Sequence, residues 1–171
     1  MNYGAIKNCD IANGPGCRVS LFVSGCRNRC KGCFQPETWN FKHGLEFTNG
    51  TLLELLESLD NHHIQGLSIL GGDPFEPENR DAVLEICKTV RHWFGDTKDI
   101  WMWTGYDFLE DGLIDLPVME HIDVLVDGRF MEELRDLSLF YRGSSNQRVI
   151  DVKKSVERRC AIRYEGKQKW K

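Results

Sequence analysis

The sequence predicts an α/β protein, a single-domain partial (open) βα barrel with a mainly parallel sheet. Runs of β-branched and aromatic residues alternate along the chain with amphipathic helical stretches, an order that favours right-handed βα crossovers between parallel strands. The length of 171 residues suits one domain, whereas a complete eightfold barrel typically needs about 250 residues. We expect the domain to cover residues 1–152, followed by a basic tail at residues 153–171.

The first expected strand covers residues 17–23 and leads directly into three cysteines. A turn at residues 13–16 precedes it, where two glycines flank a proline. The strand itself is rich in β-branched and aromatic residues. Cys26, Cys30 and Cys33 follow its carboxyl end. In proteins with parallel strands, ligands collect at this edge of the sheet.

Two amphipathic helices are expected in the middle of the chain. The first has its cap at Asn49 or Thr51 and carries a stripe of leucines on one side. The second covers residues 79–94 and ends at Gly95. Its apolar face includes Cys87, which we therefore expect to be a small core residue.

The remaining expected elements are short. In chain order they are an irregular segment at residues 34–50, strands at residues 67–70, 100–104 and 122–126, a weak helix at residues 108–119 that Pro117 interrupts, a short helix near residues 131–136 and an extended segment at residues 147–152. The aromatic residues Phe34, Trp39 and Phe41 are expected either to cover the cysteine loop or to pack into the core.

Composition and charge point to a cytoplasmic protein. Residues 1–10 lack the features of a signal peptide, and no later run approaches the length of about 20 apolar residues that a membrane span needs. The odd total of seven cysteines favours metal or redox chemistry over a disulfide framework. The formal net charge is -4, yet the tail at residues 153–171 is basic. A solvated tail is the favoured interpretation, with contact to nucleic acid or to an acidic partner as the alternative.

The spacing of the three cysteines indicates an inorganic centre. Thiolate is the ligand that zinc and iron-sulfur clusters prefer. A cubane cluster normally takes four cysteines, so a loop that supplies three leaves one iron with an exchangeable position, as a catalytic site requires. The alternative is a structural zinc site completed by His43 or Cys17.

Two other strand ends carry candidate binding residues. Gly71, Gly72 and Asp73 form a tight turn in which absent side chains let a ligand approach the backbone, and a plain turn is the alternative. Arg129 is suited to bind a ligand carboxylate, and Asp127 is suited to accept from an amine or a ribose hydroxyl. A surface ion pair is the alternative for these two residues.

The C-x3-C-x2-C spacing resembles the signature of the radical S-adenosylmethionine enzymes, and the turn at residues 71–73 resembles their Gly-Gly-Asp/Glu motif. The resemblance implies a [4Fe-4S] cluster on the three cysteines, with S-adenosylmethionine on the fourth iron. It implies that Gly32, Cys33 and Phe34 lie near the adenine and that residues 71–73 meet the amino group of the methionine part. The family usually has an aromatic residue before the third cysteine, where this chain has Gly32.

A longer resemblance covers approximately residues 1–152 and defines them as a radical S-adenosylmethionine activase domain. Motifs in this range keep the order seen in the activating proteins of anaerobic ribonucleoside-triphosphate reductase: residues 13–18, 22–26, 71–74, 103–106, 126–130 and 142–147. The resemblance implies reductive cleavage of S-adenosylmethionine and hydrogen abstraction from a glycine of the reductase large subunit. A flavodoxin-like or ferredoxin-like protein would donate the electron. Activases of other glycyl-radical enzymes usually have aspartate before Gly14, where this chain has Asn13.

Two other functions are compatible with the sequence. One is a radical enzyme that activates another glycyl-radical enzyme or acts on a small molecule, as a deazaguanine-forming synthase does. The other is a non-enzymatic zinc or iron-sulfur binding module. In either case we expect no membrane partner, and nucleic acid is the less favoured partner for the basic tail.

Overall fold

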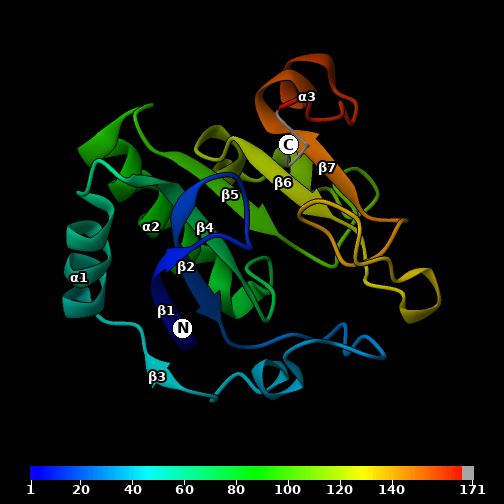
Figure 1. Cartoon of the computed structure of the whole chain (residues 1–171), viewed down its shortest axis with the longest axis horizontal. Coiled ribbons are helices and arrows are strands. Elements are labelled where there is room, and N and C mark those ends of the chain that lie inside the picture. Colours follow the sequence, from blue (N-terminus) through cyan, green and yellow to red (C-terminus); the bar gives the residue numbers. More distant parts are fainter. Residues whose placement is uncertain (167–171) are drawn as a thin grey trace.

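The structure, a computed structural model, describes residues 1–166 of the chain. These residues form one open sheet of seven strands in the spatial order β3-β1-β2-β4-β5-β6-β7 (Figure 1). The strands are β1 (Asn2–Asp10), β2 (Cys17–Val23), β3 (Leu45–Glu46), β4 (Ile64–Gly71), β5 (Asp99–Trp103), β6 (Val124–Asp127) and β7 (Arg148–Asp151). The helices are α1 (Asn49–Leu59), α2 (Pro77–Phe94) and α3 (Val152–Arg158), with 3-10 helices η1 (Pro36–Trp39), η2 (Leu113–Asp115), η3 (Pro117–Glu120) and η4 (Glu132–Leu134).

The centre of the sheet is parallel and its edges are antiparallel. Strands β2, β4, β5 and β6 run in one direction. Strands β1 and β3 extend one edge in antiparallel fashion, and β7 does the same at the other edge. The predicted α/β class and the mostly parallel, open sheet are therefore confirmed. Because parallel strands end at the same edge, the loops after β2, β4, β5 and β6 leave the sheet side by side.

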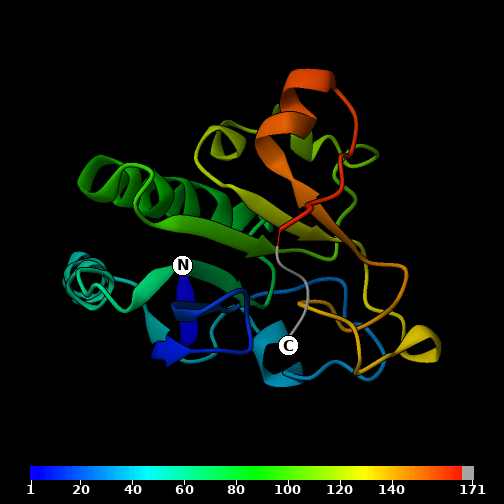
Figure 2. The ribbon, with the colours of Figure 1, turned by 45° about the horizontal axis from the view of Figure 1, so that its top comes forward.

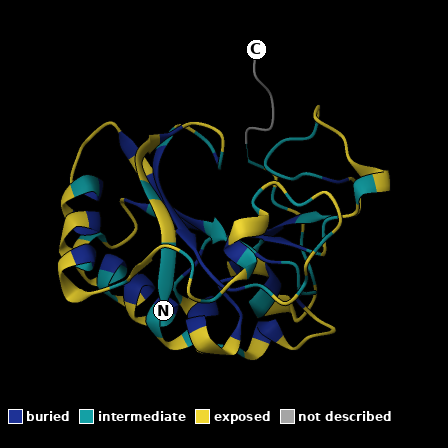
Figure 3. Ribbon diagram, turned by 90° about the horizontal axis from the view of Figure 1, so that it is seen from below, coloured by how far each residue is buried: buried dark blue, intermediate teal, exposed yellow. Residues whose placement is uncertain are grey.

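Helices cover one face of this sheet, and the main apolar core lies between the two layers. Along β2, Val19, Leu21 and Val23 belong to this core, which also includes leucines of α1 and apolar residues of α2. Figure 2 shows α2 running beside the sheet, and in Figure 3 the central strands are buried whereas the outer sides of the helices are exposed. Arg18 and Ser20, which alternate with these core residues along β2, are also buried. Because side chains alternate along a strand, they face the opposite side of the sheet.

Arg18 joins three strands and one loop on that opposite side. Its side chain is fully buried. The Nε atom donates to Ser68 Oγ at 2.7 Å, one Nη atom donates to the carbonyl of Leu67 at 2.9 Å, and the other forms an ion pair with Asp99 at 2.6 Å. Ser68 Oγ in turn donates to the carbonyl of Asn13 at 2.6 Å. The turn before β2 is therefore fixed to the middle of the sheet.

The two long helices form where the apolar periodicity predicts them, although the cap of α1 differs. The cap is Thr48, whose side chain accepts from the Thr51 backbone while Thr51 Oγ1 accepts from the Thr48 backbone. The prediction of a cap at Asn49 or Thr51 was wrong because this reciprocal capping box begins one residue earlier. Helix α2 ends at Gly95, which has φ of 55°, and Cys87 is fully buried in its apolar face, as predicted.

Several shorter elements differ from the sequence prediction. No strand was expected before the first turn, yet β1 forms there. Most of its residues are exposed, so this segment of the sequence lacks the apolar alternation that would predict a strand. The segments expected to be a weak helix at residues 108–119 and a short helix near 131–136 form 3-10 helices, η2, η3 and η4, and η3 begins at Pro117. The extended segment expected at residues 147–152 is β7, and helix α3 follows it directly.

One cysteine pair lies outside the expectation of metal or redox chemistry over a disulfide framework. Cys9 and Cys17 form a disulfide, because the antiparallel pairing of β1 and β2 brings their Cα atoms to 5.4 Å from each other. The other cysteines of the chain are free: Cys26, Cys30, Cys33, Cys87 and Cys160. The cysteine loop itself therefore contains no disulfide.

The predicted basic tail at residues 153–171 is described only as far as residue 166. Its first part is helix α3, in which Ser155 is buried. The chain then returns along the edge strand, where Arg163 bridges to Ile150 and the Tyr164 backbone donates to the carbonyl of Val149 at 2.9 Å. Residues 167–171 of the predicted tail lie outside the described residues. Among residues 1–166, no helix has the length and apolar character needed to cross a lipid bilayer.

Candidate functional site

A cavity of about 680 Å³ opens at the carboxyl ends of the parallel strands. It is lined by the cysteine loop, by the turns after β4 and β5, and by the segment after β6. From these loops the lining includes Cys26, Asn28, Cys30, Cys33, Phe34, Gly71, Gly72, Asp73, Thr104, Gly105, Gly128 and Phe130. The structure thus brings the predicted cysteines and the predicted glycine turn to one cavity.

The three cysteines of the loop are free thiols, each partly buried. Burial raises the pKa of Cys26 to about 11, and the nearby charge of Asp73 adds to this effect. Backbone N–H groups of Asn28 and Arg29 donate to the sulfur and oppose the shift. Burial thus favours the protonated form of the Cys26 thiol, and binding of a metal by this sulfur would require loss of the proton.

Three thiols at one cavity fit the ligand set of an iron-sulfur cluster, which takes one cysteine at each ligated iron. Within residues 1–166, no three His, Cys, Asp or Glu side chains gather tightly enough to hold a single metal ion. The residues considered as a fourth zinc ligand are engaged elsewhere. Cys17 is bonded to Cys9, and the ring of His43 lies against Gly4.

The turn after β4 packs directly on the backbone that leads into the first cysteine. The Gly72 N–H donates to the carbonyl of Val23 at 2.7 Å, and the Asp73 N–H donates to the carbonyl of Gly25 at 2.8 Å. A Cβ atom at position 72 would lie 2.5 Å from the carbonyl oxygen of Gly25. Only glycine therefore permits this contact between the turn and the cysteine loop.

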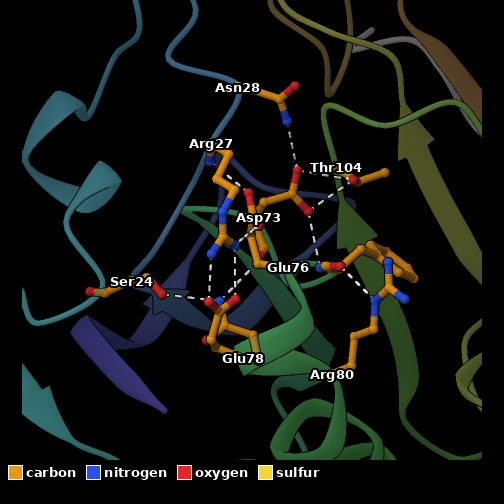
Figure 4. Close-up of polar contacts among 10 residues, drawn as sticks. Ser24, Arg27, Asn28, Asp73, Glu76, Glu78, Arg80 and Thr104 are labelled. Carbon is orange, nitrogen blue, oxygen red and sulfur yellow. Dashed lines mark hydrogen bonds and ion pairs between the residues drawn. The ribbon is translucent and has the colours of Figure 1, made fainter. Parts of the chain in front are cut away.

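The carboxylate of Asp73 holds together the turns after β4 and β5 (Figure 4). It accepts from the backbone of Phe75 at 3.0 Å, from Thr104 Oγ1 at 2.9 Å and from the backbone of Gly105 at 2.9 Å. It also accepts from Asn28 Nδ2, in the cysteine loop, at 3.2 Å. The side chain is almost fully buried, and this burial raises the pKa of Asp73 to about 6 although the hydrogen bonds oppose the shift.

A second connection joins the cysteine loop to the start of α2 through Arg27 (Figure 4). The backbone and the guanidinium of Arg27 both donate to the buried carboxylate of Glu76, each at 2.5 Å. The guanidinium also donates to both carboxylate oxygens of Glu78, at 2.8 and 2.5 Å, and lowers the pKa of Glu78 to about 2. Both the backbone and the side chain of Arg27 thus attach the cysteine loop to the start of α2.

Asp127 and Arg129 follow β6 but are engaged with protein groups. The fully buried carboxylate of Asp127 accepts from Arg148 Nε at 2.9 Å and from the backbone of Phe108 at 2.9 Å. The guanidinium of Arg129 donates to the carbonyl of Asn28. Gly128, between the two, lines the cavity. Their assignment as ligands of S-adenosylmethionine stays a prediction.

The aromatic residues expected near the cysteines divide between the loop and the cavity. Phe34 is 60% exposed and lies 5.5 Å from the ring of Phe130, centroid to centroid. Trp39 lines the cavity. The ring of Phe41 lies 4.6 Å from the Arg27 guanidinium and fills the space beside Gly25, so it supports the loop from outside.

Sequence reasoning missed the polar residues that hold the cysteine loop: Arg27, Asn28, Glu76 and Thr104. Arg27 and Asn28 stand between the cysteines, where the sequence shows only that they are polar. Their partners lie in other loops, so no local spacing reveals them. The one available signal was that Thr104 is the last residue of the strand predicted at residues 100–104, whereas Glu76 does not adjoin any predicted strand end.

Comparisons with known proteins place the chain in a family. Residues 12–150 match the model of a family described as a 4Fe-4S single cluster domain. An anaerobic ribonucleoside-triphosphate reductase-activating protein of Enterobacteria phage T4 is 44% identical over 149 residues, which cover 87% of this chain and 93% of the phage protein. Proteins of the same name are 43% identical in Escherichia coli K12, over 87% of this chain and 97% of that protein, and in Vibrio cholerae, over 86% and 96%.

Proposed function

The chain belongs to the family of anaerobic ribonucleoside-triphosphate reductase-activating proteins and contains a 4Fe-4S single cluster domain, and from this premise we propose that it is a radical S-adenosylmethionine enzyme. Its function would be to activate an anaerobic ribonucleotide reductase by forming a glycyl radical on that partner. The observation that carries the proposal is the convergence of three free cysteines and the Gly71–Gly72 turn on one cavity. When bound, the cluster and S-adenosylmethionine supply the electron transfer and the hydrogen abstraction.

In this proposal Cys26, Cys30 and Cys33 hold the cluster and leave one iron free for S-adenosylmethionine. The protein's part is to bind, orient and exclude water. The carbonyls of Gly71 and Gly72 suit the amino group of the ligand, because they accept its protons without adding a full charge. No side chain has to act as a general acid or base.

The remaining site assignments follow the same premise. The backbone of Gly32, Cys33 and Phe34 lies near the adenine. Asp73 acts by holding the turns around the ligand, because its carboxylate is occupied by four donors. Arg129 binds the ligand carboxylate with the guanidinium N–H groups that do not donate to the carbonyl of Asn28, and Asp127 supports this loop through Arg148.

The architecture suits a large substrate. We propose that the open sheet, with its helices on one face, is a partial βα barrel within an activase domain at residues 1–152, and that the reductase large subunit inserts its glycine-bearing loop through the open side. A flavodoxin-like or ferredoxin-like protein supplies the electron. The setting is the cytoplasm, and neither a membrane nor nucleic acid takes part.

The deciding experiment compares Cys30→Ala with Cys160→Ala in anaerobically reconstituted protein. Cys160 is a free, exposed cysteine outside the cavity, so its variant controls for the loss of a thiol. With dithionite as reductant, Cys30→Ala should reduce the 5'-deoxyadenosine release and the glycyl-radical signal of the reductase by at least about 100-fold, because mutating even a residue that only hydrogen-bonds to a metal ligand costs roughly 10–100-fold. Cys160→Ala should match wild type.

Other outcomes separate the alternative functions. Equal 5'-deoxyadenosine release by Cys30→Ala and wild type would show that the cluster assignment is wrong. Colourless wild-type protein with one bound zinc and no cleavage would identify a binding module. Cleavage without a glycyl radical on the reductase, tested beside other glycyl-radical enzymes, would direct attention to another partner or a small molecule.

A further inference from the structure

Asn28, between the first and second cysteines, contacts the loops that follow three different strands. Its Nδ2 donates to Asp73, after β4, at 3.2 Å. Its backbone carbonyl accepts from Arg129, after β6. Its backbone N–H donates to the sulfur of Cys26. The side chain of Asn28 also lies on the backbone of Gly105, after β5.

The contact with Gly105 is close enough to fix the distance between the two loops. A Cβ atom at position 105 would lie 2.5 Å from Asn28 Nδ2 and 2.8 Å from its Cγ. Figure 4 shows the Asn28 amide directed toward Asp73 and Thr104. Lys31 in the same loop behaves differently, since its side chain is 89% exposed.

We propose that Asn28 is a positioning residue. It fixes the cysteine loop relative to the turns after β4 and β5, which would bind the S-adenosylmethionine held by the free iron of the cluster. The proposal rests on the proposed function. An amide at this position suits the task because it donates to the Asp73 carboxylate and stays neutral at every working pH. The hydrogen bond has a charged acceptor, so its loss costs more than that of a neutral pair. A shift of Asn28 would move Cys26 relative to the Gly71–Gly72 turn.

The test exploits the equal size of asparagine and aspartate. Asn28→Asp preserves shape but replaces the donor with a carboxylate that faces Asp73, whereas Asn28→Ala removes the side chain. The readout is the change that S-adenosylmethionine causes in the electron paramagnetic resonance spectrum of the reduced cluster. The concentration for half-maximal change should rise about tenfold in Asn28→Ala, as expected for the loss of a hydrogen bond to a charged group, and further in Asn28→Asp. A space-filling role predicts that Asn28→Asp equals wild type.

One further variant separates positioning from a general effect on the loop. Lys31→Gln changes an exposed residue of the same loop and should leave the titration unchanged. Iron and sulfide content, measured in every variant, should stay at the wild-type level.

The outcomes are distinct from those that test the proposed function. If wild type shows no spectral change with S-adenosylmethionine, the proposed function fails. If wild type responds and both Asn28 variants respond at the same concentration, the positioning role fails. Loss of iron from both Asn28 variants but not from Lys31→Gln would also overturn it, because the residue would then serve only cluster retention.

Discussion

The carboxyl group of Asp73 shows how one residue links the stability of the site to pH. Its burial raises its pKa to about 6 from the ordinary value of 3.8. Between these values the folded protein keeps a proton that the unfolded chain has lost, so the free energy of unfolding decreases as pH rises and levels off above pH 6. The difference between the two pKa values corresponds to about 3 kcal/mol.

We therefore expect the stability difference between wild type and Asp73→Asn to change with pH. Wild type should lose up to about 3 kcal/mol relative to the variant between pH 4 and pH 6, and the difference should be constant at higher pH. Urea unfolding of the cluster-free protein at several pH values measures it. A difference that stays constant from pH 4 to pH 6 would refute the raised pKa.

At this scale the sequence predicted some members of the site and missed others for a physical reason. The cysteines and the Gly71–Gly72 turn were predictable because ligand spacing and backbone freedom are local properties. Arg27 and Asn28 were not, because their roles depend on partners such as Glu76 and Asp73 that reach them only after folding. The hydrogen-bond partners of Asp127 and Arg129 likewise depend on tertiary contacts.

The connection between the cysteine loop and α2 belongs to the scale of elements. Glu76 and Glu78 both accept from Arg27, but the Glu76 side chain is fully buried whereas that of Glu78 is 49% exposed. Hydrogen bonds to a buried carboxylate contribute more than those to an exposed one, because water does not compete for the acceptor. Exposed pairs are screened by water and contribute little. The two glutamates thus form a natural matched pair.

We predict that Glu76→Gln lowers the free energy of unfolding by about 2 kcal/mol and speeds loss of iron from the reconstituted protein. Glu78→Gln should change neither quantity measurably, because its carboxylate is exposed. Urea unfolding and the decay of cluster absorbance in the presence of a chelator give the two measurements. Equal effects of both substitutions would mean that burial of Glu76 does not matter to the anchoring of the loop.

Periodicity predicted the long elements well and the short ones poorly. Helices α1 and α2 each bury one regular apolar face, and this pattern is visible in the sequence. Strand β1 is held by pairing with β2 and β3 and exposes most of its side chains, so it leaves no alternation to detect. The 3-10 helices η2 and η3 are too short to show a period.

For the molecule as a whole, the main apolar core covers one face of the sheet, and Arg18 lies beside a smaller apolar cluster around Trp101 on the other. Arg18 is fully buried and is paired with Asp99, whose side chain is 28% exposed. We predict that Arg18→Met lowers the free energy of unfolding by about 3–5 kcal/mol, because Asp99 loses its partner in a largely buried setting. Urea unfolding measures this change.

The matched control is Arg159→Ala. Arg159 and Asp115 form an ion pair at 2.7 Å in which both side chains are more than 60% exposed, so its removal should leave the unfolding curve unchanged. An equal loss in both variants would show that the buried arginine has no special part in holding the sheet. The α/β class was predictable from the alternation of strands and helices, whereas a buried arginine spanning β2, β4 and β5 was not.

The placement of the Asn28 amide over Gly105 restricts how this protein and its relatives can change during evolution. The Asn28 side chain fills the space that a side chain at position 105 would need, so a larger residue at either position requires a smaller one at the other. A side chain at 105 becomes tolerable only in a chain that carries a smaller residue at 28. Across related sequences the two sites should therefore vary as a pair, and an ancestral exchange at one of them should precede or accompany an exchange at the other.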